Sequence, residues 1–360
     1  MSRRAVWIAL ASVALTVGGV VSLCGILWNN IPGYSGDWFI FWLVARADPA
    51  RLYHDLHAFP FPYPPSALLL VKPFGGFSAW VAFALWSALG MAAIVTAARR
   101  LGVGWGAIGV AALMPCLLSC VVFGQTSLFV GAALMGGVAA RSPRLSMTLF
   151  GIAMAIKPQS AIALPFALAA AGEWRRLTGS IIVAASVAGI AVSLWGAGLW
   201  QTWWEALPHF RALLIERHVD VMDVGVNGLR LWLGWPSWAH LFGVALGVVM
   251  VVATWRGSRE PMARYAALAC GAALISPYTL SYDLAGLSVV AVAALIDSER
   301  KPADWAIVAP IVAGVWPNVG VIGLGCLLAW RYRRGTDSGL KATELRREQD
   351  VPIPDIRPAA

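Results

Sequence analysis

Asp37 is the residue of this sequence best placed to act as a base. It follows a long N-terminal apolar run and lies between Gly36 and Trp38. At the edge of an apolar segment a carboxylate can stay ionised and accept a proton, as a general base does. Asp is also a favoured N-cap residue, so Asp37 alternatively begins the helix that follows, and the two roles are compatible.

Lys157 is a cation in the middle of an apolar segment, 146–171, where it is followed by Pro158. An ionisable residue at membrane depth is costly, which makes it a functional-site candidate. Proline lacks a backbone donor and disfavours helix in the residue before it, so we expect two short helices with Lys157 at the tip between them. There the ammonium can bind a phosphate group as a point charge. The alternative is that the side chain snorkels to the membrane interface.

The sequence contains no pattern that predicts a metal or a cofactor. His54 and His57 are three residues apart without an obvious third ligand. No Asp-x-Asp pair, glycine-rich phosphate loop or dinucleotide-binding pattern is present. The five cysteines all lie inside apolar segments and form no Cys-x-x-Cys pair, so we expect inert thiols.

The elements that must position these residues are membrane helices. The chain of 360 residues is 59% hydrophobic and 12% charged, with a mean hydropathy of +0.72, which excludes an ordinary water-soluble domain. A nucleic-acid partner is excluded as well, because the basic residues separate apolar segments instead of forming a patch. The apolar segments lie near 5–27, 77–98, 103–122, 126–140, 146–171, 177–200, 237–255, 262–276, 280–296 and 305–332.

The distribution of Lys and Arg predicts the orientation of these segments. With the N-terminus in the cytoplasm, 16 of the 27 Lys and Arg residues fall at cytoplasmic edges, 4 more fall in the C-terminal tail and 7 lie outside. Segment 146–171 has basic flanks on both sides, which favours a broken-helix hairpin over a single crossing. Segment 305–332, interrupted at Trp316-Pro317-Asn318, has the same pattern. We therefore predict about ten crossings, a retained first helix and both termini in the cytoplasm.

This topology gives one integral membrane domain, 1–334, and a tail, 335–360, whose composition predicts disorder. Two external loops, 28–76 and 201–236, hold most of the polar residues outside the basic turns. Asp48, which precedes Pro49 in the first loop, has the pattern of a cap or turn residue.

Several motifs resemble, in order and spacing, those of glycosyltransferase family 87. They are Asp37, Asp48-Pro49 with Tyr53, Tyr63-Pro64-Pro65, Lys72-Pro73, Gly124-Gln125-Thr126-Ser127, Gly151 with Lys157-Pro158, Arg175-Arg176, Asn227-Gly228, and Ser276-Pro277. After the last motif the family often has a His, whereas this chain has Tyr278, Tyr282 and Asp283. The resemblance covers most of residues 30–285.

The resemblance implies an all-α polytopic fold of the GT-C type, with about 10–12 transmembrane helices including short broken-helix hairpins, in the bacterial inner membrane. It implies a glycosyltransferase that moves a hexose, mannose being the first candidate, from a polyprenyl-phosphate sugar to a hydroxyl of a lipid or glycan at the extracytoplasmic face. Asp37 would be the general base and Lys157 would lie near the donor phosphate. Further candidates for substrate binding are Gln125, Arg51, His54, Tyr63, Asn227 and Arg230. Gln125 has a plain turn as its alternative, and no metal or cofactor is implied.

A secondary transporter is the main alternative, because it too would contain broken helices and a few intramembrane charges. A lipid flippase is another alternative. The acidic residues concentrate in the two external loops, and no internal repeat is visible. Both observations favour an enzyme that works at the membrane surface.

Overall fold

The computed structural model describes residues 3–30, 37–54, 60–216, 223 and 225–297, and the elements in these ranges are all helical. The long helices and their neighbours are α1 (Arg3–Asn30), α2 (Asp37–Arg46), α3 (Leu68–Val71), α4 (Ala79–Leu101), α5 (Trp105–Ala112), α6 (Pro115–Val122), α7 (Ser127–Ala139), α8 (Pro143–Ile156), α9 (Leu164–Ala170), α10 (Trp174–Trp195), α11 (Gly198–Glu216), α12 (Val226–Trp232), α13 (Ala239–Gly257), α14 (Pro261–Ile275) and α15 (Ala285–Asp297). Short 3-10 turns join them: η1 (Pro49–Arg51), η2 (Pro65–Ala67), η3 (Lys72–Gly76), η4 (Pro158–Ala161) and η6 (Ser281–Leu284).

Four of these helices, α1, α4, α10 and α13, are long and apolar enough to cross a membrane. The pair α5 and α6 passes the same test together, although it is bent by 59°. The predicted all-α polytopic membrane architecture is therefore confirmed. The count of about ten crossings stays a prediction, because the other apolar helices are shorter and segment 305–332 and the tail 335–360 lie outside the described residues.

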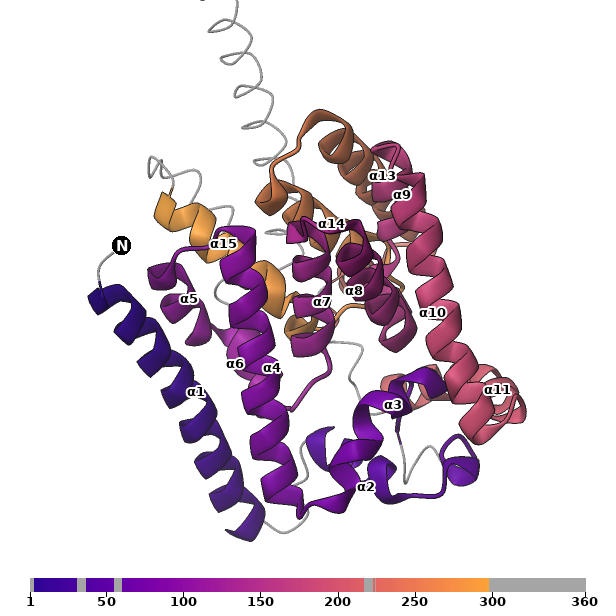
Figure 1. Cartoon of the computed structure of the whole chain (residues 1–360). Helices are drawn as coiled ribbons and strands as arrows, with labels where there is room; N and C mark the ends of the chain where they lie inside the picture. The colour runs from indigo at the N-terminus through magenta and orange to yellow at the C-terminus, as the bar shows by residue number, and fades with distance from the viewer. Residues whose placement is uncertain (1–2, 31–36, 55–59, 217–222, 224, 298–360) are drawn as a thin grey trace, which may run out of the picture.

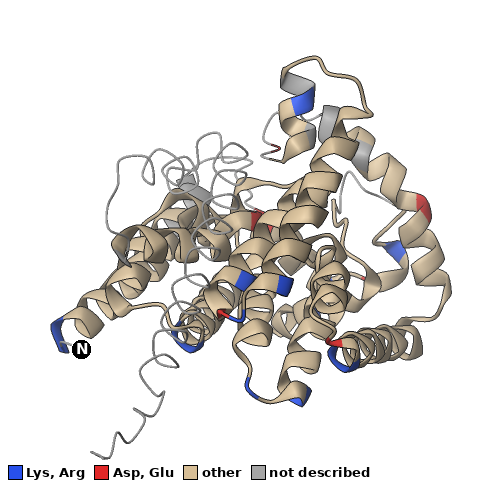
Figure 2. Cartoon of the chain, turned by 90° about the horizontal axis from the view of Figure 1, so that it is seen from above, with Lys and Arg blue, Asp and Glu red and all other residues tan. Residues whose placement is uncertain are grey.

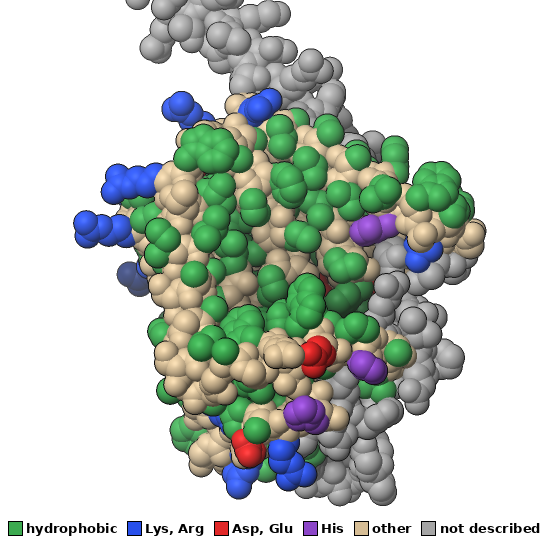
Figure 3. Space-filling model, turned by 90° about the vertical axis from the view of Figure 1, so that its right-hand side faces the viewer, with side chains coloured by type: hydrophobic (Ala, Val, Ile, Leu, Met, Phe, Trp, Pro, Cys, Tyr) green, Lys and Arg blue, Asp and Glu red, His purple; other side chains and the backbone are tan. Residues whose placement is uncertain are grey.

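The outer surface carries large exposed apolar side chains, which are favourable against lipid and unfavourable against water. Trp7 of α1, Ile182 of α10 and Phe242 of α13 are 70%, 65% and 72% exposed. Figure 3 shows hydrophobic side chains across most of one face, and Figure 2 shows how few positions along the ribbon carry a charge. Soluble proteins do not expose apolar surface on this scale. We infer that these helices face lipid.

Both predicted external loops lie at one end of the molecule. In Figure 1, α1 and α10 run towards the end where α2, α3 and α11 lie, and α4 runs away from it. The two loops touch, since the indole Nε1 of Trp203 in α11 donates to the carbonyl oxygen of Pro62 at 3.0 Å. The distribution of basic residues predicts that both loops lie on the same side of the membrane, and their position at one end of the molecule is consistent with that prediction.

The apolar segment 146–171 is broken where the sequence predicts. Helix α8 ends at Ile156, Lys157 has φ −143° and ψ 78°, and η4 begins at Pro158. Because Pro158 has no backbone N–H, the helical hydrogen-bond ladder cannot continue through it. Helix α9 follows and leads into α10 (Figure 1). The Lys157 side chain is consequently held at a helix end, inside the helical bundle.

Candidate active site

The site is organised by one tight turn, Gly124–Ser127, between α6 and α7. Gly124 has a φ of +62°, a conformation that residues with a side chain rarely adopt. A Cβ at Gly124 would lie 2.7 Å from the Cβ of Trp38 in α2. The glycine therefore lets α2 approach the turn closely enough for Asp37, the first residue of α2, to meet Gln125.

The substitution Gly124→Ala should destabilise the protein by about 2–4 kcal/mol, because it adds a steric clash to the strain of a positive φ. Gly172→Ala is the matched control, since Gly172 has a φ of +70° but no atom within 4 Å of its would-be Cβ. The control should cost only about 1 kcal/mol. Thermal unfolding of both variants in detergent measures the difference. Equal midpoints would show that the approach of α2 to the turn does not matter.

A chain of hydrogen bonds ends on the carboxylate of Asp37. Thr126 donates its hydroxyl to the Tyr63 hydroxyl oxygen at 3.0 Å, and Tyr63 donates in turn to Oε1 of Gln125 at 3.2 Å. The amide nitrogen Nε2 of Gln125 then donates to Oδ2 of Asp37. Gln125, Thr126 and Tyr63 are 2%, 0% and 6% exposed, so the chain is shielded from solvent. Because Tyr63 donates to Oε1 of Gln125, the Gln125 amide is oriented with its nitrogen towards Asp37, which accepts the last hydrogen bond of the chain.

The next residue of the turn, Ser127, belongs to a second charged centre. The ammonium of Lys157 forms an ion pair with Oδ1 of Asp283 and donates to the Ser127 hydroxyl oxygen at 3.1 Å. Ser127 donates to the same Asp283 oxygen at 2.6 Å. The Lys157 ammonium also lies 5.7 Å from the ring centroid of Tyr63 and 5.6 Å from that of Tyr282, within the range of cation–π attraction. Lys157 is 2% exposed, so its charge depends on these partners.

Both centres open into one hollow of about 780 Å³, a volume that includes the open space at its mouth. Asp37, Tyr63, Gln125, Lys157 and Asp283 contribute polar groups. The apolar part of the wall is formed by Ile40, Phe41, Pro60, Pro62, Phe210, Leu213 and Leu280. A few convergent polar groups in an apolar-walled hollow are typical of a ligand site.

Burial raises the pKa of Asp37, because an ionised carboxylate loses solvation when it leaves water. The Gln125 hydrogen bond and the positive charge of Lys157 act in the opposite direction. A base must be deprotonated to work, so activity that depends on Asp37 is lost as the pH falls through this raised pKa. The acidic limb of the profile should therefore lie above the range of an ordinary aspartate.

Gln125→Leu should move that acidic limb to still higher pH, because it removes a donor that stabilises the ionised carboxylate. The measurement is kcat/KM as a function of pH for the wild type and the variant. Gln201→Leu makes the same change at an exposed position of α11, where Gln201 donates to Glu205, and should leave the profile unchanged. A limb that stays in place in Gln125→Leu would separate Gln125 from the titration of Asp37.

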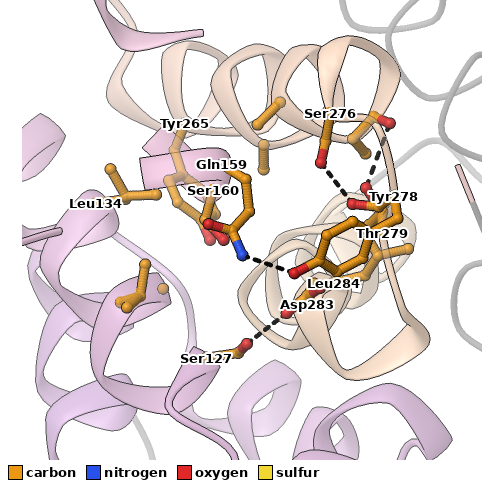
Figure 4. A pocket seen from close by; sticks show the side chains of 15 residues that line it. Ser127, Leu134, Gln159, Ser160, Tyr265, Ser276, Tyr278, Thr279, Asp283 and Leu284 are labelled. Atoms are coloured by element: carbon orange, nitrogen blue, oxygen red, sulfur yellow. Dashed lines mark hydrogen bonds between the residues drawn. The ribbon is translucent and has the colours of Figure 1, made fainter. Parts of the chain in front are cut away.

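A second hollow of about 480 Å³, again including open space, is drawn in Figure 4 and shares lining residues with the first. Its hydrogen-bonding groups come from Ser127, Gln159, Ser160, Tyr265, Ser276, Tyr278, Thr279 and Asp283. Gln159 donates to the Tyr278 hydroxyl at 3.2 Å. Tyr278 and Asp283 line both hollows, and Asp283 therefore lies on the boundary between them.

The structure brings together four of the eight predicted site residues: Asp37, Tyr63, Gln125 and Lys157. Arg51, His54 and Arg230 do not line the hollow, and the side chain of Asn227 lies outside what the structure describes. Arg51 ends η1 and His54 follows it, both exposed. Arg230, in the last turn of α12, donates from Nη1 to the carbonyl oxygen of Trp235 at 3.1 Å, and Asn227 lies in the same helix. His57 lies outside the described residues.

Asp283 and Ser127 complete the site, and the sequence did not assign them a role. A signal for Asp283 existed, because a buried lysine requires a counter-charge and Asp283 is an acid at the start of an apolar segment. The described residues contain no group of three or more His, Cys, Asp or Glu side chains able to hold a metal. What these side chains can do together is accept a proton at Asp37 and bind an anion at Lys157.

A comparison with known families gives one match. The model of glycosyltransferase family 87 matches residues 61–277, which is more than half of the chain. The matched range contains Tyr63, the Gly124–Ser127 turn and Lys157. Asp37 lies 24 residues before its start at residue 61, and Asp283 lies 6 residues after its end at residue 277. Neither a curated protein nor a solved structure matches the chain.

Proposed function

The chain belongs to glycosyltransferase family 87 and is thus a membrane glycosyltransferase. From this premise we propose that it transfers a hexose, with mannose as the first candidate, from a polyprenyl-phosphate sugar to a hydroxyl of a lipid or glycan. The reaction takes place at the extracytoplasmic face of a bacterial inner membrane. The family assignment favours this enzyme over the transporter and flippase alternatives.

The observation that carries the proposal is that a carboxylate and an ammonium line one apolar-walled hollow. In the reaction the acceptor hydroxyl oxygen forms a bond to the anomeric carbon of the sugar. The bond between that carbon and the phosphate oxygen breaks, and its electron pair leaves with the polyprenyl phosphate. Asp37 accepts the proton of the acceptor hydroxyl, and the Lys157 ammonium stabilises the negative charge on the departing phosphate.

A lipid-linked donor suits this hollow better than a nucleotide sugar does. Ile40, Phe210 and Leu213 supply apolar wall, and the only cation among the described lining residues is Lys157. A sugar phosphodiester carries a single negative charge, which one ammonium can bind once that ammonium is released from its ion pair with Asp283. A nucleotide diphosphate carries more charge and usually recruits a metal or a cradle of backbone amides.

The acceptor would approach from the side of Asp37, because a general base must lie within hydrogen-bonding reach of the hydroxyl that it deprotonates. Asp37 is half-buried, and α2 and α11, which flank the hollow, belong to the two predicted external loops. This placement supports an acceptor that arrives at the membrane surface.

Purified protein in proteoliposomes tests the donor class. We expect label to move from polyprenyl-phosphate mannose to a product in a membrane-lipid extract, and none to move from GDP-mannose. Polyprenyl-phosphate glucose and polyprenyl-phosphate arabinose complete the panel and identify the sugar. Transfer from the nucleotide sugar in the absence of the lipid donor would overturn the donor assignment.

A further inference from the structure

The charges around the hollow do not favour an anionic ligand as they stand. Among the described lining residues the charged groups are Asp37, Lys157 and Asp283, one cation against two carboxylates. The one ammonium is already paired with Asp283. A donor phosphodiester would add another negative charge in a site with few compensating groups, where like charges repel strongly.

Asp283 can lose the ammonium without becoming an orphaned charge. Its Oδ1 accepts from the Ser127 hydroxyl at 2.6 Å, and its Oδ2 accepts from the backbone N–H of Leu280 at 3.2 Å. It also lies on the boundary with the second hollow (Figure 4). Lys157, by contrast, has only the Ser127 hydroxyl oxygen as a second hydrogen-bond acceptor among the described residues. The pair is therefore asymmetric, and Lys157 depends on it more than Asp283 does.

We propose that Asp283 is a positioning residue whose carboxylate holds the Lys157 ammonium in the empty site and is replaced there by the donor phosphate. Donor affinity is then set by competition between the carboxylate and the phosphate for one ammonium. This inference rests on the proposed function, since it takes the phosphate of a polyprenyl-phosphate sugar as the ligand of Lys157.

The competition predicts a variant that is less stable than the wild type without ligand but binds an anionic ligand more tightly. Asp283→Asn keeps the size of the side chain and removes its charge, which leaves the buried Lys157 without a counter-ion. The ligand-free protein should then be less stable, with a melting temperature lower by about 5 °C. An anionic ligand should bind about tenfold more tightly than to the wild type, because it no longer competes with a carboxylate.

Polyprenyl phosphate, which cannot transfer a sugar, is the probe, and uncharged polyprenol of the same length is its control. We measure the Kd and the melting temperature of wild type and Asp283→Asn with each lipid. The expected result is tighter binding of polyprenyl phosphate by the variant and a larger rise in its melting temperature, with no such difference for polyprenol. Equal or weaker binding of polyprenyl phosphate by the variant would overturn the inference.

Glu173→Gln is the matched control, because it breaks ion pairs with Arg176 and Arg264, both 2.9 Å long, away from the hollow. It should not change the affinity for polyprenyl phosphate. If Asp283→Asn is recovered only when polyprenyl phosphate is present during purification, the phosphate has replaced the carboxylate and the inference holds. If it is not recovered even then, Asp283 has a purely structural role and the inference fails.

The two proposals fail separately. Sugar transfer by the wild type from the lipid donor, together with unchanged phosphate affinity in Asp283→Asn, would sink the competition and leave the proposed function intact. Absence of transfer from any lipid donor would sink the proposed function. The affinity of the two proteins for polyprenyl phosphate would still decide the role of Asp283.

Discussion

Asp37→Asn should lower the rate of sugar transfer by about 100- to 10,000-fold, the usual contribution of a general base. The amide cannot accept the acceptor proton, yet it has nearly the shape of the carboxylate and can still accept the Gln125 hydrogen bond through its oxygen. Donor binding should not weaken, because Lys157 and its partners are untouched and one carboxylate that repels the phosphate is neutralised. The measurement is single-turnover transfer at saturating donor, alongside the Kd for polyprenyl phosphate.

The control for this variant is Asp48→Asn, the same change in the same loop. Asp48 is exposed and caps η1, where its side chain accepts from the backbone N–H of Ala50 at 3.1 Å. The Asp48→Asn variant should transfer sugar at nearly the wild-type rate. A transfer rate in Asp37→Asn within a few fold of wild type would remove Asp37 as the base and leave it the role of a helix-starting residue.

Lys157→Met should have the second largest effect, because it removes the cation of the site while retaining a long side chain. We expect kcat/KM for the lipid donor to fall by about 100-fold, the cost of leaving a buried anion without its charged partner. The variant should lose only about 1 kcal/mol of stability, less than Asp283→Asn loses, because Asp283 keeps its hydrogen bonds from the Ser127 hydroxyl and the Leu280 N–H. Initial rates over a range of donor concentrations and a thermal unfolding curve check the two effects.

Lys72→Met shows whether these effects are specific. Lys72 lies in the first predicted external loop, where its ammonium donates to the carbonyl oxygen of Ala47 at 2.6 Å, away from the hollow. Burial lowers the pKa of Lys72, so its charge too is partly desolvated. The Lys72→Met variant should have the same kcat/KM for the lipid donor as the wild type. A loss of donor affinity as large as that in Lys157→Met would mean that the donor phosphate binds elsewhere.

Local features of the structure were predictable from the sequence because they depend on neighbouring residues. The break before Pro158 follows from the chemistry of proline, and the cap at Asp48 follows from its position before Pro49. Counting the basic turns predicts that the two loops emerge on the same side, and in the structure both lie at one end of the molecule. Their contact through Trp203 and Pro62 was not predicted.

Pairings across the chain were not predictable in the same way. Lys157 and Asp283 are 126 residues apart, and no local pattern encodes which of several acids meets the lysine. The same limit applies to Arg51 and His54: the family resemblance suggested them as site residues, but both are exposed in the structure. Asn227-Gly228 owes part of its pattern to packing, because a Cβ at Gly228 would lie 1.9 Å from the carbonyl oxygen of Asp223.

The apolar wall of the hollow, with Phe210 and Leu213 on α11, has a consequence for the meaning of concentration. The lipid-linked donor that we propose would reach this wall dissolved in the bilayer. Its rate of encounter would then depend on its mole fraction among the lipids and not on its molarity in the bulk solution. Adding inert lipid at a fixed total amount of donor should slow the enzyme by surface dilution. With such a donor, kinetic constants would be comparable between preparations only when they are expressed per mole fraction of donor in the membrane.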